Sequence, residues 1–150
     1  MRDLGFQRLF IEQLRDFYWA ENQIAHSLHK MADAATSDEL KNILNDHLDV
    51  TKSQVSRMEK ILERLGESTE GQPGPAVKGL LQEGSQIIES FHHDGKVRDA
   101  ALIIAARKIE HYEIASYGSL VALADQMEDA QTMELLNSDP QPFEAPDRSR

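Results

Sequence analysis

The sequence predicts an all-α protein, a helical bundle of three long helices, a short crossover helix and a truncated final helix. Three observations indicate this fold. Apolar residues recur at helical spacing along most of the chain, no stretch alternates with period two for long enough to form a strand, and glycine and proline gather between the apolar segments. Helices with one wide apolar stripe, separated by short turns, are the units that pack into bundles.

The first two long helices are expected in the amino-terminal half. An apolar stripe over residues 14–31 predicts the first helix. A second stripe over residues 40–65 predicts the next helix, which is capped at its start by Ser37 or Thr36 and ended by Gly66. The Gly- and Pro-rich stretch that begins at this glycine is a linker by composition.

Three further helices are expected in the carboxy-terminal half. A stripe over residues 77–91 predicts the short crossover helix. The turn at Asp94-Gly95 leads into the third long helix, which is expected to begin near Val97. A last amphipathic piece over residues 130–136 stops before a cluster of prolines, because proline cannot continue the helical hydrogen-bond ladder.

Length and proline content predict one domain followed by a tail. The chain has 150 residues, the size of a single domain with one hydrophobic core. Three of its five prolines follow residue 136. We therefore expect a helical bundle domain over residues 1–136 and a Pro-rich C-terminal tail over residues 137–150.

Composition excludes several classes of function. The chain has no cysteine, which excludes disulfides, thiolate nucleophiles and cysteine-ligated metals, so a metal would need carboxylate and imidazole ligands. A net charge of −10 disfavours nucleic-acid binding. No apolar run is long enough for a membrane span, which predicts a cytoplasmic protein without membrane contacts. No motif of a known enzyme class is present, which favours a non-enzymatic role.

Four polar residues fall on or beside the stripes expected to be buried: Glu21, His47, Glu110 and Glu113. If the three long helices pack together, these side chains can converge, and di-iron or di-manganese sites of ferritin-like bundles are built from such parts. Simpler interpretations remain open for each residue. Glu21 could reach water from the edge of its stripe, His47 could be a hydrogen-bonded core histidine, and the other two glutamates could pair with nearby surface cations.

The sequence resembles the bacterial YciF/YciE family of ferritin-like, stress-associated proteins over about residues 6–136. Four segments carry the resemblance: Ala20-Glu21-Asn22-Gln23, His47-Leu48-x-x-Thr51-x-x-Gln54, Val97-Arg98-Asp99-Ala100-Ala101-Leu102, and Glu110-His111-Tyr112-Glu113-Ile114-Ala115-Ser116-Tyr117-Gly118. The resemblance implies a ferritin-like bundle, usually dimeric, with a carboxylate-rich metal site and no settled reaction.

Two departures from the family pattern affect that metal site. The family places a glutamate in the second long helix where this chain has Val50, and Asp49 points away from the stripe. The family also continues into a full final helix with further acidic residues, whereas here prolines follow Leu136. A two-metal site needs about four carboxylates and usually two nitrogen ligands. Glu21, His47, Glu110 and Glu113 supply at most about two-thirds of that set.

The sequence therefore predicts a stress-associated structural or oligomeric interaction module with an incomplete metal site. A short final helix leaves an apolar trough, which predicts a homo-oligomer, a dimer or larger, that fills it. The alternative is a di-metal protein that oxidises or sequesters iron, with its site completed by a partner subunit. Iron or manganese at partial occupancy and no metal at all are both compatible with these residues.

Overall fold

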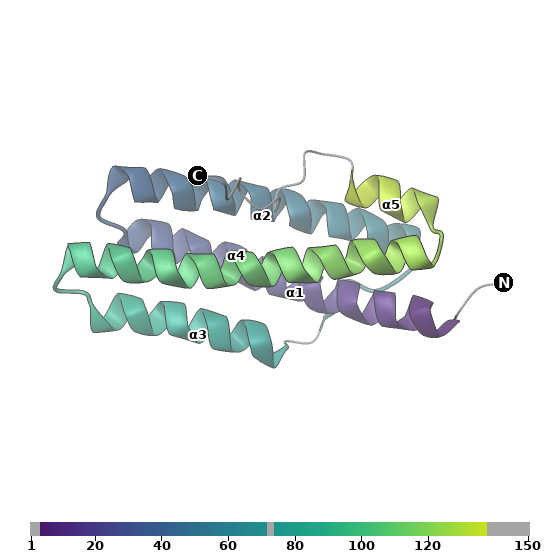
Figure 1. The fold of residues 1–150 in the computed structure, drawn as a ribbon, viewed down its shortest axis with the longest axis horizontal. Coiled ribbons are helices and arrows are strands. Elements are labelled where there is room, and N and C mark those ends of the chain that lie inside the picture. Colours follow the sequence, from purple (N-terminus) through teal and green to yellow (C-terminus); the bar gives the residue numbers. More distant parts are fainter. Residues whose placement is uncertain (1–3, 72–73, 138–150) are drawn as a thin grey trace.

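The computed structural model describes residues 4–71 and 74–137, and these residues form five α-helices and no strand. The helices are α1 (Leu4–Ala34), α2 (Asp38–Arg64), α3 (Pro75–Ser90), α4 (Gly95–Gln126) and α5 (Ala130–Leu136). They lie along one long axis, with α5 as a short piece at one end (Figure 1). The predicted all-α bundle is confirmed, whereas most of the predicted tail lies outside the described residues.

The helix ends follow from the residues that cap them. Ser37 is the N-cap of α2, and its hydroxyl accepts a hydrogen bond from the Leu40 N–H at 3.2 Å. Gly66 follows the C-cap of α2 with φ +69°, a conformation that glycine adopts without strain. Asp94 caps α4, so this helix begins at Gly95 rather than near Val97, because the carboxylate there satisfies a free N–H of the first turn.

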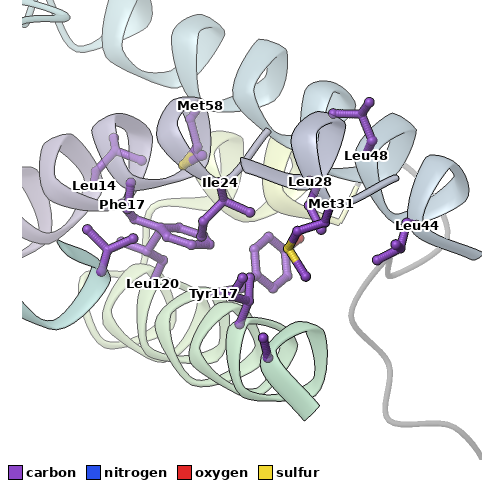
Figure 2. Packing of buried hydrophobic residues seen from close by; sticks show 14 of the residues in the cluster. Leu14, Phe17, Ile24, Leu28, Met31, Leu44, Leu48, Met58, Tyr117 and Leu120 are labelled. Atoms are coloured by element: carbon purple, nitrogen blue, oxygen red, sulfur yellow. The ribbon is translucent and has the colours of Figure 1, made fainter. Parts of the chain in front are cut away.

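The core lies along α1, which packs against α2, α3 and α4. Figure 2 shows how the apolar side chains of α1 meet those of α2 and α4, with Phe17 and Ile24 facing Met58, Tyr117 and Leu120. All five of these side chains are buried. No helix within the described residues has a segment that is both long and apolar enough to cross a membrane.

The side of the bundle on which α2 and α4 lie is less closely packed than the side formed with α1, and we call it the α2–α4 face. The two helices touch only sparsely, and α5 packs against both of them at one end. Ile43 on α2 is 56% exposed and Ile103 on α4 is 46% exposed. Both belong to this face because helical spacing places Ile43 one turn before His47 and Ile103 two turns before Glu110.

The linker between α2 and α3 crosses the outside of α1. The guanidinium of Arg15 donates to the carbonyl oxygen of Glu70 from Nε at 3.0 Å and from Nη2 at 2.6 Å. A Cβ added at Gly71 would meet the carbonyl oxygen of Arg15 at 2.7 Å and Cβ of Trp19 at 2.8 Å. The linker lies this close to α1 because glycine has no side chain there.

A polar corner fastens the α1–α2 loop to the start of α4. The carboxylate of Asp99 accepts hydrogen bonds from the backbone N–H groups of Thr36 at 2.7 Å and Ser37 at 2.9 Å. The neighbouring Arg98 donates to the carbonyl oxygens of Ala34 at 2.8 Å and His92 at 2.9 Å. The two helical hairpins, α1–α2 and α3–α4, are therefore joined at their turns.

We expect Asp99→Ala to lower the free energy of unfolding by about 1–3 kcal/mol, since two backbone donors lose their acceptor. Urea denaturation followed by circular dichroism measures the change. The same substitution at Asp49, an exposed residue of α2, is the control and should change stability little. Equal effects of the two substitutions would show that the corner contributes nothing specific.

Candidate functional site

Glu21 lies in the middle of α1 and is wholly buried. Its neighbours on the helix face are Phe17 and Ile24, which are also buried. Neither carboxyl oxygen of Glu21 has a hydrogen-bond partner among the described residues. The side chain is therefore not at the solvent edge of its stripe, which was one of the simpler interpretations of the sequence.

Glu113 brings α4 and α2 together at the same level. Its carboxylate is 0% exposed and lies 2.5 Å from His47, measured from Oε1 to Nε2. The hydroxyl of Thr51 donates to the other oxygen, Oε2, at 3.1 Å. His47 and Thr51 are four residues apart, so both side chains lie on the side of α2 that faces Glu113.

Burial and mutual repulsion set the protonation of the two glutamates. Burial raises the pKa of Glu21 well above its ordinary value, and the negative charge of Glu113 and a hydrogen bond between the two carboxyl groups raise it further. We therefore infer that Glu21 is a neutral acid. A shared proton gives Glu21 the hydrogen bond that its fixed oxygens lack.

His47 carries the balancing charge. Burial alone would lower the pKa of its imidazole, but the hydrogen bond to Glu113, the charge of Glu113 and then the charge of Glu110 raise it on balance. Its side chain is 11% exposed, so it lies at the outer side of the cluster. We call Glu21, His47, Thr51 and Glu113 the buried acidic cluster, and the raised pKa of His47 favours a positive charge beside its carboxylates.

Three of the four residues predicted from the sequence meet in this cluster. Glu110 does not join them by hydrogen bonding; it is half-buried and acts on His47 through its charge. Thr51 was not predicted as a site residue. The sequence contains a signal for it, because Thr51 lies one turn after His47 in the same apolar stripe. A hydroxyl that is buried in such a stripe needs a hydrogen-bond partner.

The cluster does not fit a two-metal site. Within residues 4–71 and 74–137, no three His, Asp or Glu side chains are grouped so that they could hold a metal ion together. Both oxygens of Glu113 already accept hydrogen bonds, and Val50 supplies no carboxylate one turn from His47. Two-metal sites of bundle proteins use about four carboxylates.

The helix order and the acidic cluster between α1, α2 and α4 place the chain in the class of ferritin-like bundle proteins. The chain belongs to the family described as "Domain of unknown function (DUF892)", which matches residues 5–141. It is 41% identical over 120 residues to Protein YciF of Escherichia coli (strain K12), an alignment that covers 79% of this chain and 72% of that protein.

Two solved structures share the fold. YcfI from Rhodopseudomonas palustris aligns with a TM-score of 0.82 and 34% identity, covering 92% of this chain and 87% of that chain. The crystal structure of the E. coli stress protein YciF aligns with a TM-score of 0.81 and 38% identity, covering 89% of this chain and 84% of that chain. These matches confirm the family and the ferritin-like fold.

The raised pKa values predict a stability that falls as pH rises. Native Glu21 keeps a proton that the unfolded chain releases above the ordinary pKa of 4.5, and His47 acts in the same direction above 6.5. Each group contributes at most about 1.4 kcal/mol per pH unit. Glu21→Gln removes the first contribution. The free energy of unfolding of the variant minus that of the wild type should therefore increase as pH rises.

Urea denaturation of metal-free protein between pH 5 and pH 8, about the range over which both groups titrate, measures this difference. Glu63→Gln, the same change at an exposed position of α2, is the matched control. A difference between wild type and Glu21→Gln that stays constant over the range would contradict a buried neutral acid at position 21.

Proposed function

We propose that this protein is a structural and interaction module of its family that self-associates through the α2–α4 face. In this proposal the buried acidic cluster serves the architecture of the bundle rather than metal chemistry. The E. coli relative is described as a stress protein, and we extend that association to this chain. The observation that carries the proposal is that His47 and Thr51 already satisfy both oxygens of Glu113.

The side chains of the buried acidic cluster pair with one another, so the cluster needs no bound cation. Glu113 is paired with an imidazole whose pKa is raised, and Glu21 is neutral beside it. A buried charge that is paired and hydrogen-bonded has no need of a further ligand. These interactions join α1, α2 and α4, which is a structural role.

The surface supports an interface between copies. Ile43 and Ile103 are exposed on the α2–α4 face, and half-buried Val50 and Ile114 lie on the same sides of α2 and α4 by helical spacing. Apolar side chains gathered on one face are typical of a protein–protein interface. Each copy has a charge of −10, so association requires a face where apolar contact outweighs repulsion.

A second candidate function is metal binding with ligands completed by a second copy. It is favoured by the two buried carboxyl groups of Glu21 and Glu113 beside the imidazole of His47, because carboxylate and imidazole are ligand types that bind such metals. Glu110, half-buried beside His47, could be a further ligand nearer the surface. Iron and manganese are the metals that carboxylate and imidazole ligands of such bundles hold, for oxidation or storage of iron.

Metal analysis separates the two candidates. For protein purified without chelator, we expect well under one Fe, Mn or Zn ion per chain, because the protein ligands are already hydrogen-bonded to one another. Two metal ions per chain would overturn the structural proposal. The metal-binding candidate instead requires that Glu21→Ala and Glu113→Ala abolish metal uptake while Glu63→Ala leaves it intact.

Light scattering coupled to size exclusion tests self-association. We expect an oligomer at micromolar concentration and a shift to monomer in Ile43→Glu and Ile103→Glu, because each adds a charge to the apolar face. Ile104→Glu is the matched control, since Ile104 is 56% exposed but points about 100° away from Ile103 around α4. A wild-type monomer would defeat the proposal.

A further inference from the structure

The turn between α4 and α5 contains a strained residue. Glu128 has φ +56°, a left-handed conformation that is unfavourable for a residue with a side chain. Its backbone N–H donates to the carbonyl oxygen of Asp125 at 3.0 Å, and the N–H of Asp129 donates to that of Ala124 at 3.2 Å. This pair of hydrogen bonds is the Schellman motif, in which glycine is the usual residue at the left-handed position. The turn therefore holds a glutamate where the backbone favours glycine.

The end of α2 provides an internal comparison. Gly66 has φ +69°, and its N–H donates to the carbonyl oxygen of Glu63 at 3.0 Å. The N–H of Glu67 donates to the carbonyl oxygen of Leu62 at 2.9 Å, so the pattern is the same as at the end of α4. Among the residues that the structure describes, Glu128 is the only one besides glycine with a positive φ. One helix end is therefore relaxed and the other is strained.

Glu128 is the position at which α5 can turn away from its own α2. A negative φ is the ordinary conformation of glutamate, and adopting it at this residue would redirect the chain that follows. α5 keeps its cap in that case, because Asp129 accepts a hydrogen bond from the N–H of Thr132 at 3.1 Å within the α5 segment. Relaxing one residue therefore moves α5 as a unit.

α2 supplies the place where α5 docks. Arg64, in the last turn of α2, donates to the side-chain oxygen of Gln131 at 3.0 Å and to the carboxylate of Asp129 at 2.6 Å. It also donates to the hydroxyl of Thr132. Leu136, at the end of α5, is wholly buried. A second copy has the same α2 and offers these same contacts, so an exchange of α5 between two copies preserves them.

The α2–α4 face brings the parts of two copies together for this exchange. α2 and α4 run in the same direction, because both begin at the polar corner and both end beside α5 (Figure 1). A two-fold axis along the bundle therefore places α2 of one copy opposite α4 of the other. Ile43 then faces Ile103 of the second copy, and each α4 ends at about the level where α2 of the other copy ends.

We propose that two associated copies exchange α5, so that α5 of each copy docks on Arg64 and the end of α2 of the other. This proposal rests on self-association through the α2–α4 face and adds the segment that holds the two copies together. The exchange keeps the contacts of α5 and relieves the strain at Glu128 in both copies. Short hinge loops under strain favour exchange of this kind.

Removing the strain tests the exchange. In Glu128→Gly the turn is relaxed without exchange, so we expect the dissociation constant of the pair to rise about tenfold for each copy, or about a hundredfold in total. Light scattering over a concentration series measures this constant. Glu67→Gly, in the turn after α2, relieves no positive φ and is the matched control, which should leave the constant unchanged. Equal constants for Glu128→Gly and the wild type would overturn the exchange.

Reversal of charge across the contact identifies the copy that supplies α5. Arg64→Glu and Asp129→Lys each place like charges at the contact. When the two variants are unfolded and refolded together, exchange between unlike copies restores opposite charges at both contacts. We expect the mixture to unfold at a midpoint about 2–4 °C above that of either variant alone. Two separate transitions, at the midpoints of the single variants, would overturn the exchange.

Failure of the exchange is distinguishable from failure of self-association. A wild-type monomer at micromolar concentration defeats both proposals. A wild-type oligomer whose dissociation constant is unchanged by Glu128→Gly, and whose charge-reversed variants gain no stability on mixing, defeats the exchange and leaves association through the α2–α4 face intact.

Discussion

The carboxylate of Glu113 links the parts of the bundle that apolar packing leaves apart. α2 and α4 touch only sparsely, yet His47 and Thr51 on α2 both reach Glu113 on α4. Glu21 brings α1 to the same point. A buried charge tolerates little displacement of its partners, so this interaction sets where α4 lies relative to α2.

The same constraint places polar groups among the apolar contacts of α2. The buried stripe of this helix packs on α1 through residues such as Leu48 and Met58. Thr51 lies on that stripe and His47 at its edge, where both reach α4, and Arg64 reaches Asp129 just before α5. Hydrogen bonds fix the positions of these neighbours but bury little apolar area, which leaves aliphatic side chains exposed on the α2–α4 face.

Most of the fold could be predicted from the sequence, because apolar spacing and caps such as Ser37 are local signals. The same signals placed Glu21 and Glu113 on or beside stripes expected to be buried, but they left open whether each side chain reaches water or a surface cation. The hydrogen bonds between them were not, because they depend on how the helices are rotated against one another. The burial of Arg57, which is 5% exposed, had no signal in the sequence, since an arginine on a helix is ordinarily at the surface.

The polar corner at Asp99 has a consequence for the way the chain is assembled. It joins the turns of the two hairpins at one end of the molecule, while the linker lies against α1 through the hydrogen bonds between Arg15 and Glu70. Each hairpin presents its apolar side to the other, so the contacts that join the two hairpins do not depend on an unbroken backbone between them. The two hairpins, made as separate polypeptides, should recognise each other and rebuild the bundle by fragment complementation.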